Sequence, residues 1–201
     1  MFRIRRRPES ARLQDPLAWH IEFMVALANV LRPSVYVELG VHRAELFNRI
    51  IPFAGQLIGV DTDPETAKSI QKAPNTRFVC GTTATFADEL HEFPIAIDML
   101  FIDADHRREA VLKDFHDYFP FVRPHGLLLL HDTHPGDSGL IDPGGAWCGD
   151  AYRAIEQLQS DSGGYEMMTI PVSPGLTLCR KRTSQLSWTE QAQESWRYLE
   201  E

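Results

Sequence analysis

The sequence predicts an α/β fold, a Rossmann-like three-layer αβα sandwich around a mostly parallel seven-stranded sheet whose last strand is antiparallel. Short β-branched or apolar runs alternate with helix-sized segments, as parallel strands joined by crossover helices require. Residues 95–102 form a near-continuous apolar run interrupted only by Asp98, and residues 127–130 are apolar throughout. Both patterns are typical of strands buried on both faces. The length of 201 residues suits one domain.

The first half of the chain supplies three of the strands. Asp15 followed by Pro16 predicts the start of the first helix, which Pro33 ends. The apolar face of this helix is Leu17, Ile21, Val25 and Ala28. After it we expect a strand at 35–39, a helix at 44–51, a strand at 57–61, a helix opened by Asp63-Pro64, and a strand at 77–79.

The second half begins with the apolar strand 95–102. The helix that follows carries Val111, Phe115, Tyr118 and Val122 along one side. We then expect a strand at 127–130, a helix at 152–158, and strands at 165–170 and 176–178. Because residues 171–175 are few enough for a hairpin-type turn, the last two strands are predicted to be antiparallel.

We expect one domain over residues 1–201. Residues 1–14 are basic and lack the apolar stretch of a secretory signal, so they predict a flexible N-terminus. The Gly- and Pro-rich stretch 135–149 predicts a loop that acts as a substrate lid. In the predicted C-terminal helix 184–201, two tryptophans fall on one stripe, which either packs on the domain or forms a homodimer contact.

Charge, hydropathy and cysteine content exclude several classes of protein. The net charge is −8 and basic residues cluster only at residues 3–7, so the chain lacks the positive face with which nucleic-acid enzymes meet phosphates. No apolar run approaches the ~20 residues that span a membrane. Three widely spaced cysteines fit neither a disulfide framework nor a zinc motif. We therefore expect a cytoplasmic protein with a small-molecule partner.

Polar and acidic residues gather where the predicted strands end. In an open parallel sheet, ligands bind beyond the carboxyl ends of the strands. The residues there are Glu38-Leu39-Gly40, Asp61, Gly81-Thr82-Thr83, Asp103-Ala104-Asp105-His106 and His131-Asp132-Thr133-His134. Helix capping explains one or two of these positions but not the whole series. The sequence therefore predicts a binding site at this edge of the sheet.

Two cofactor classes compete for the loop after the first strand. A dinucleotide needs G-x-G-x-x-G so that backbone amides approach its pyrophosphate, but His42 and Glu45 replace the second and third glycines. S-adenosylmethionine has no phosphate and carries a positive sulfonium, so it tolerates an acidic loop. Asp61 follows Gly40 by 21 residues (61 − 40), the spacing at which a carboxylate accepts hydrogen bonds from ribose hydroxyls.

Four segments carry a resemblance to a known family. VYVELGV, LIGVDTDP, IDMLFIDADH and RPHGLLLLHDTH, in this order and spacing, resemble the class I S-adenosylmethionine-dependent methyltransferases over residues 33–182. The branch they resemble most includes catechol-type O-methyltransferases and metal-dependent sugar O-methyltransferases of macrolide biosynthesis. The resemblance therefore implies S-adenosylmethionine as the cofactor and a small-molecule hydroxyl as the methyl acceptor.

The resemblance also implies which residues contact the cofactor. It puts Glu38 and Gly40 by the methionine part, Asp61 at the ribose and Thr82 or Thr83 near the adenine, with Thr62 and Asp103 as further contacts. The sequence departs from the family in the first loop, where Ala44 stands in place of a common glycine and Glu45 follows it.

A metal site follows from the strand ends. Asp103 and Asp132 end adjacent predicted strands, where the metal-dependent relatives carry their metal acids, and Mg²⁺ takes one or two such carboxylates. His131 or Thr133 completes the predicted site. In those relatives the residue three after the first acid is the general base, and here it is His106, an imidazole whose ordinary pKa suits proton transfer.

Alternatives remain open at this point. His131 and His134 flank Asp132, which favours Mn²⁺ or Zn²⁺ over Mg²⁺. If the site is not catalytic, Asp105 is simply the N-cap of the following helix and His106 is a solvated residue. The other functions to weigh are an NAD-linked oxidoreductase, which the missing glycines disfavour, and a non-catalytic nucleoside-binding module, in which an intact set of acids and histidine has no purpose.

Overall fold

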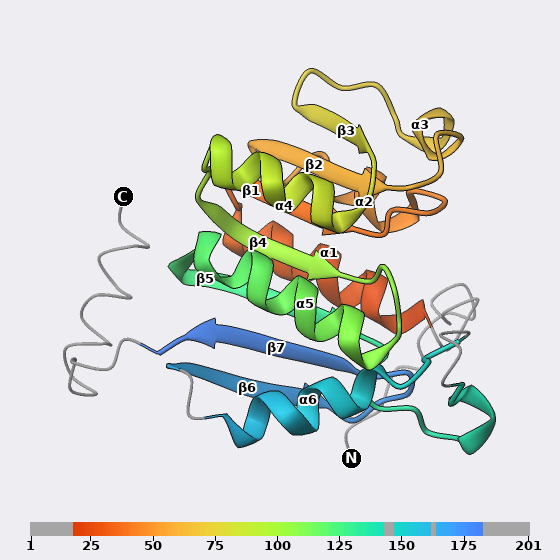
Figure 1. The fold of residues 1–201 in the computed structure, drawn as a ribbon. Helices are drawn as coiled ribbons and strands as arrows, with labels where there is room; N and C mark the ends of the chain where they lie inside the picture. The colour runs from red at the N-terminus through yellow and green to blue at the C-terminus, as the bar shows by residue number, and fades with distance from the viewer. Residues whose placement is uncertain (1–17, 143–146, 162–163, 183–201) are drawn as a thin grey trace, which may run out of the picture.

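The computed structural model describes residues 18–142, 147–161 and 164–182. The strands are β1 (Val35–Leu39), β2 (Gln56–Asp61), β3 (Thr76–Cys80), β4 (Ile97–Ile102), β5 (Val122–His131), β6 (Tyr165–Ile170) and β7 (Leu176–Lys181). The helices are α1 (Trp19–Leu31), α2 (Glu45–Ile50), α3 (Thr66–Ser69), α4 (Thr83–Glu92), α5 (Arg108–Tyr118) and α6 (Ala151–Ser160), with 3₁₀ helices η3 (Phe119–Phe121) and η4 (Ser138–Leu140). Every predicted strand is present (Figure 1).

The strands form one seven-stranded sheet in the order β3-β2-β1-β4-β5-β7-β6. β1 pairs in parallel with both β2 and β4, and β4 pairs in parallel with β5. β7 runs antiparallel to β5 and to β6, its two neighbours. The predicted fold class, a mostly parallel sheet with an antiparallel last strand, is confirmed.

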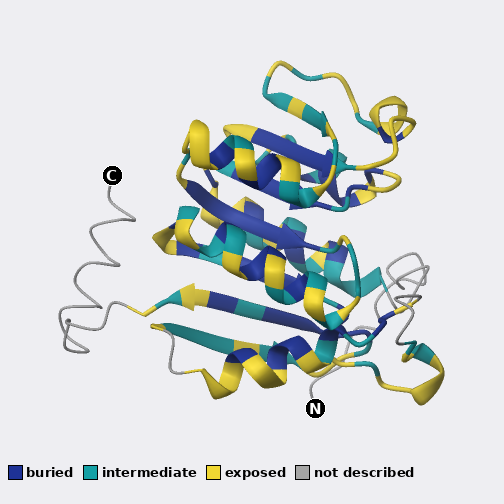
Figure 2. Ribbon diagram, in the orientation of Figure 1, coloured by how far each residue is buried: buried dark blue, intermediate teal, exposed yellow. Residues whose placement is uncertain are grey.

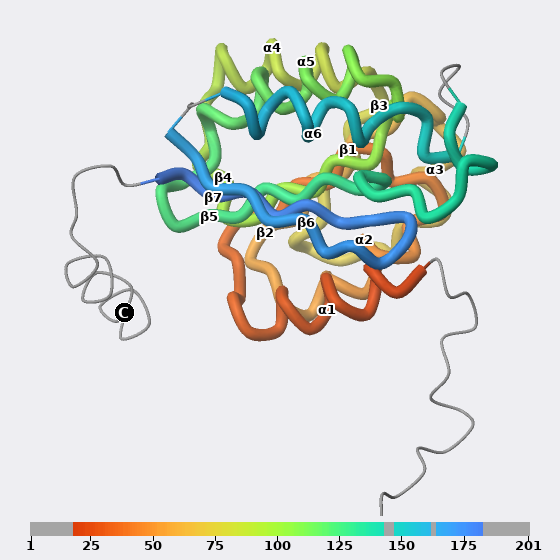
Figure 3. Tube along the Cα trace, turned by 90° about the horizontal axis from the view of Figure 1, so that it is seen from below, coloured from red at the N-terminus to blue at the C-terminus, as the bar shows by residue number. Residues whose placement is uncertain are grey.

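Helices cover both faces of the sheet (Figure 3). α4, α5 and α6 lie on one face, and α1 and α2 lie on the other. Each face has its own apolar cluster, and β4 is buried along its whole length between them (Figure 2). No helix in the described part of the chain is long and apolar enough to cross a membrane.

Asp98 is the acidic residue that interrupts the apolar run of β4. It is buried, and its carboxylate accepts a hydrogen bond from the backbone nitrogen of Val35 at 2.8 Å and pairs with Arg123 at 3.3 Å. A buried carboxylate is stable only with such partners. Asp98 therefore has a structural role at the amino-terminal edge of the sheet, away from the predicted site.

Two helix predictions differ from the structure. The helix after β4 ends at Tyr118, and Val122 begins β5 instead of continuing the helical stripe. Pro120 explains the difference, because it lacks the N–H donor that would continue the α-helix, and residues 119–121 form the 3₁₀ helix η3 instead. Val122 is still buried. The helix after Asp63-Pro64 is a single turn, α3, although the Asp63 carboxylate does accept a hydrogen bond from the nitrogen of Glu65 at 2.9 Å.

Several predictions fall outside the described residues. These are the helix start at Asp15, the basic stretch 1–14, the C-terminal helix 184–201 with its dimer contact, and part of the lid loop 135–149. They stay predictions.

Candidate active site

Gly40 lets the loop after β1 touch the loop after β4. Its φ is +86°, and a Cβ atom there would lie 2.1 Å from the carbonyl oxygen of Asp103. Only glycine tolerates both this backbone conformation and this approach. The two loops mark the switch point of the sheet, because the chain runs from β1 outward to β3 and returns to β4 on the other side of β1. Open α/β sheets bind ligands at such a point.

Asp61, at the end of β2, orders the same loop. Its Oδ2 atom accepts hydrogen bonds from the backbone nitrogens of Val41 at 3.0 Å and His42 at 2.7 Å, and its Oδ1 atom accepts one from Asp63 at 2.9 Å. A carboxylate accepts about four hydrogen bonds, so capacity remains for a ribose hydroxyl. The ribose contact stays a prediction, and the structure adds a second role for Asp61 in shaping the loop.

Ala44 replaces the glycine that is common in the resembling family, yet the loop keeps a left-handed backbone there. Its φ is +57°, and the neighbouring His42 has a φ of +49°. Each such residue costs roughly 1–2 kcal/mol. Ala44 is fully buried, so its methyl group packs in the core, which offsets part of that cost. The substitution therefore changes the energy of the loop and not its path.

Glu38 lies behind this loop. Its side chain is buried, and its Oε2 atom accepts a hydrogen bond from the Tyr36 hydroxyl at 2.6 Å. Burial raises the pKa of Glu38 to about 8, although the Tyr36 hydrogen bond acts in the opposite direction. Glu38 does not line the cavities described next. Its contact with the cofactor stays a prediction.

Two cavities lie on either side of a shared junction formed by Gly40, Asp61 and Ala104. The larger has a volume of about 520 Å³ and the smaller about 350 Å³. The larger cavity is lined by Ala18, His20, Gly40, His42, Asp61, Asp103, Ala104, His106, His131, Asp132, Leu140, Trp147, Cys148 and Pro174. Both sizes suit small molecules.

The smaller cavity contains the predicted threonines. Thr62, Thr82 and Thr83 line it together with Asp105, Lys113 and Asp114. Thr82 also caps α4, since its side chain accepts a hydrogen bond from the nitrogen of Thr85 at 3.1 Å.

Sequence reasoning missed Asp114 in this cavity. Burial raises the pKa of Asp114 to about 6, while a hydrogen bond from Thr83 acts in the opposite direction. The signal in the sequence was an acidic residue beside Phe115 on the buried side of α5, where an apolar residue is the norm.

Three residues predicted to carry the chemistry meet in the larger cavity. The Nε2 atom of His106 lies 3.5 Å from Oδ1 of Asp103 and 3.3 Å from Oδ2 of Asp132. One potential ligand atom from each residue lies within 4.8 Å of the others. Burial alone lowers the pKa of His106, but the carboxylates of Asp103 and Asp132 raise it to about 9. His131 and His106 lower the pKa of Asp103 in spite of its burial.

His131 joins this group from the end of β5. Its Nδ1 atom lies 3.0 Å from Oδ1 of Asp103, in a hydrogen bond, and 3.4 Å from Oδ1 of Asp132. Burial lowers its pKa, but the two carboxylates raise it to about 10. Thr133 is buried and accepts a hydrogen bond from the Thr177 hydroxyl at 2.8 Å, so it links β5 to β7. His134 is exposed and is not among the residues whose side chains are close enough together to hold a metal ion.

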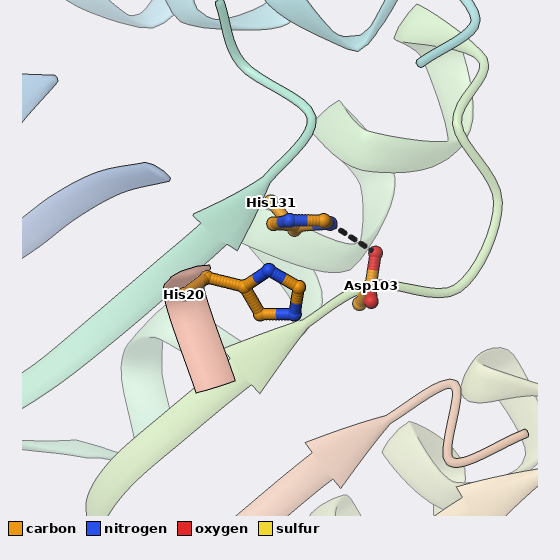
Figure 4. A group of neighbouring side chains, drawn as sticks. All are labelled: His20, Asp103 and His131. Carbon is orange, nitrogen blue, oxygen red and sulfur yellow. Dashed lines mark hydrogen bonds and ion pairs between the residues drawn. The ribbon is translucent and has the colours of Figure 1, made fainter. Parts of the chain in front are cut away.

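His20 is the histidine that sequence reasoning missed. It comes from the start of α1, and its ring lies 3.9 Å from that of His131 between centroids, beside the Asp103 carboxylate (Figure 4). The signal was present in the helical period, because His20 precedes Met24 and Ala28 by four and eight residues, and these two are fully buried. A histidine on the buried face of a helix was not weighed.

The end of the loop predicted to be a lid, residues 147–150, contacts His106. The carbonyl oxygen of Trp147 forms a hydrogen bond with Nδ1 of His106, and the nitrogen of Asp150 donates to the His106 carbonyl at 3.1 Å. Gly149 has a φ of +52°, and a Cβ atom there would lie 2.3 Å from the same carbonyl oxygen. Nδ1 therefore faces the loop, and Nε2 faces the carboxylates.

Comparisons with known proteins point to one family. Residues 34–133 match a family model described as a methyltransferase domain. The O-methyltransferase TomG from Streptomyces achromogenes, solved in complex with S-adenosylmethionine, superposes with a TM-score of 0.66 at 17% identity, over 82% of this chain and 80% of that one. An O-methyltransferase from Bacillus cereus, in complex with S-adenosylhomocysteine, gives 0.66 at 12% identity, over 86% and 85%.

The fold reaches beyond O-methyltransferases. An rRNA methylase from Streptococcus thermophilus superposes with a TM-score of 0.59 at 11% identity, over 86% of this chain and 100% of that one. No curated protein sequence matches the chain. At these identities the superpositions show the fold, and the acceptor has to be argued from the site itself.

Proposed function

Because the chain belongs to the class I S-adenosylmethionine-dependent methyltransferases, we propose that it methylates a hydroxyl group of a small molecule, with a divalent metal held by Asp103 and Asp132. In this proposal His106 is the base. The observation that carries it is the meeting of these three side chains in the larger cavity, next to the junction that this cavity shares with the smaller one.

The two cavities divide the binding of the cofactor. The adenine lies in the smaller cavity beside Thr62, Thr82 and Thr83, and the ribose lies at Asp61. The sulfonium and its methyl group then reach the junction at Gly40, where the larger cavity begins. Gly40 lines both cavities at this junction, and the carboxylates beyond it favour the positive sulfonium.

Methyl transfer to oxygen is an in-line displacement. The acceptor oxygen forms a bond to the methyl carbon while the carbon–sulfur bond breaks, and its electron pair stays on sulfur to give S-adenosylhomocysteine. The hydroxyl proton goes to Nε2 of His106. Because Nδ1 of His106 forms a hydrogen bond with the Trp147 carbonyl oxygen, Nε2 is the nitrogen left for this proton.

The donor set fits a divalent cation. The carboxylates of Asp103 and Asp132 present ligand oxygens close together in a cavity open to small molecules, while Nε2 of His106 beside them stays uncoordinated for the proton. When bound there, a metal lowers the pKa of an acceptor hydroxyl and orients it. Without a cation, the carboxylates hold His106 in its charged form at neutral pH, since they raise its pKa to about 9. A cation at the carboxylates therefore favours the neutral imidazole that a base requires.

The larger cavity supports a small acceptor. Its volume of about 520 Å³ matches typical small-molecule sites, and Leu140, Trp147 and Pro174 give it apolar walls. The net charge of −8 disfavours a nucleic-acid acceptor. All three cysteines are free, which supports a cytoplasmic location.

The test is an acceptor panel. The protein is incubated with S-adenosylmethionine and, separately, a catechol, a sugar, a phenol, a primary amine and a short RNA, each with Mg²⁺, with Mn²⁺ and with EDTA. We expect S-adenosylhomocysteine to form with a hydroxyl acceptor and EDTA to abolish it. Turnover on the amine alone contradicts the hydroxyl acceptor, and turnover on the RNA alone contradicts the small-molecule acceptor. Turnover that survives EDTA contradicts the metal.

A further inference from the structure

We propose that His20, Asp103 and His131 form a second cation site, selective for a borderline transition metal such as Zn²⁺ over Mg²⁺. The site lies on the α1 side of Asp103, whereas the group of Asp103, His106 and Asp132 lies on the lid side. The proposal goes beyond methyl transfer, because it concerns what the protein binds with neither cofactor nor acceptor present.

The geometry brings three donors together from distant parts of the chain. One nitrogen from each imidazole and one oxygen of Asp103 lie within 4.8 Å of one another (Figure 4). A tetrahedral metal with bonds of about 2.0–2.2 Å holds its ligand atoms about 3.3–3.6 Å apart, so rotations of the side chains have to draw the donors together by up to about 1.5 Å. His20 is contributed by α1, Asp103 by the end of β4 and His131 by the end of β5.

His131 supplies an independent sign of a missing ligand. Its side chain is 9% exposed, and its Nε2 atom is buried with no hydrogen-bond partner among the described residues. A buried polar atom without a partner costs about 1–3 kcal/mol and calls for an explanation such as an unplaced ion. The other ring nitrogen, Nδ1, forms a hydrogen bond with Asp103, so the imidazole is held beside this carboxylate.

The donor set decides which metal the site prefers. Imidazole nitrogen suits zinc, nickel, copper and iron, while magnesium selects oxygen. Two imidazoles and one carboxylate therefore favour Zn²⁺, whereas the two carboxylates of Asp103 and Asp132 favour Mg²⁺ or Mn²⁺. Because Asp103 belongs to both groups, the two sites are adjacent, and each kind of ion has its own preferred side of this carboxylate.

Occupancy of the site has a structural consequence. His20 and Ala18 line the larger cavity from the start of α1, and the Trp19 indole nitrogen donates to the carbonyl oxygens of Val172 and Ser173 at 3.1 Å and 3.0 Å. A metal bound by His20 ties this wall of the cavity to the ends of β4 and β5. Zn²⁺ is therefore expected to raise the melting temperature, because it binds the folded chain.

The experiment is calorimetry on protein freed of metal, titrated with Zn²⁺ and separately with Mg²⁺. The test variant is His20→Phe, which keeps a ring to pack against Phe101, whose centroid lies 6.1 Å from that of His20. The control is His91→Phe, at an exposed histidine of α4 whose ring packs against Phe121. We expect His20→Phe to lower Zn²⁺ affinity at least about tenfold, since loss of a residue that only orients a ligand already costs that much.

The other expected results follow from the same site. Mg²⁺ affinity and S-adenosylmethionine affinity stay unchanged in His20→Phe, and the control variant binds both metals as the parent does. Co²⁺, used as a coloured probe, gives a visible absorption band with the parent protein that weakens in His20→Phe. Should His20→Phe fold poorly by circular dichroism, His20→Gln replaces it, because an amide is a weak zinc ligand of similar length.

Equal Zn²⁺ affinity in the parent and in both His20 variants overturns the proposal. The same holds if Asp132→Asn abolishes Zn²⁺ binding while the His20 variants leave it intact, because the metal then lies wholly on the lid side. These outcomes are separate from the proposed function, since a protein that binds Zn²⁺ through His20 but methylates no hydroxyl acceptor contradicts only the latter.

Discussion

The two cavities on either side of Gly40 differ in how the chain builds them. The smaller cavity takes its walls from the ends of β2 and β3 and from the first turns of α4 and α5, and its threonines and Asp61 also make local caps and turns. The larger cavity draws on α1, the ends of β4 and β5, the lid loop and the β6–β7 turn. The lining of the smaller cavity lies within residues 40–114, whereas that of the larger cavity extends from residue 18 to residue 174. Binding and chemistry should therefore respond to different substitutions.

His106→Ala gives the largest expected effect, and it is confined to the larger cavity. Turnover should fall by about 10²–10⁴-fold, because the acceptor proton loses its base, while S-adenosylmethionine affinity stays nearly the same. Steady-state kinetics and calorimetry check this, with His91→Ala as the control for the loss of an imidazole. A matching loss of cofactor affinity would show that cofactor binding and proton transfer are not separated between the two cavities.

Asp61→Ala is the corresponding change at the junction. Hydrogen bonds to a charged group contribute about 1.5–3 kcal/mol each, so cofactor affinity should fall by about ten- to a hundredfold. Loss of the bonds to the nitrogens of Val41 and His42 also loosens the loop. Calorimetry with S-adenosylmethionine measures the effect, and Asp88→Ala on the exposed side of α4 is the control. Unchanged affinity would remove Asp61 from the cofactor site.

Glu38→Gln tests the buried acid behind both cavities through pH. The pKa of Glu38 is raised to about 8 in the folded protein by burial, above its ordinary value of 4.5. The folded state therefore binds the proton more tightly, and this stabilisation is full below about pH 4.5 and is lost as pH rises through about 8. The stability of the parent relative to Glu38→Gln should fall by about 1–3 kcal/mol between about pH 5 and pH 8. Denaturation without cofactor measures it, and parallel profiles for the two proteins would contradict the assignment.

Gly149→Ala gives the smallest expected effect and separates the lid from the rest of the larger cavity. The added Cβ atom meets the His106 carbonyl oxygen at 2.3 Å, so the loop must move away from His106. Turnover should fall by about tenfold with unchanged cofactor affinity, since small displacements near a catalytic group are costly. Gly164→Ala is a matched control, because Gly164 has a φ of +69° and nothing within 4 Å of the added atom. Equal losses in both variants would point to backbone strain alone.

The sequence predicted the sheet well because its signals are local. The apolar run of β4, the β-branched start of β1 and the glycine at residue 40 each reflect the environment of a few neighbouring residues. The same holds for the strand-end carboxylates Asp61, Asp103 and Asp132, since the end of a strand can be located from its own apolar run. The end of α5 was placed too late because the prediction followed the apolar stripe past Pro120.

The sequence by itself determined the order of the strands along the chain and the residues at one edge of the sheet, and it favoured S-adenosylmethionine as the cofactor. Only the tertiary structure decided which of those residues meet. It brought His20 from α1 to Asp103 and His131, left His134 exposed, buried Glu38 behind the loop, and set the carbonyl of Trp147 against His106. The reason is physical: a period of 2 or 3.6 residues tells which face a side chain occupies, but contacts between segments far apart in the sequence depend on how the helices and loops dock on the sheet.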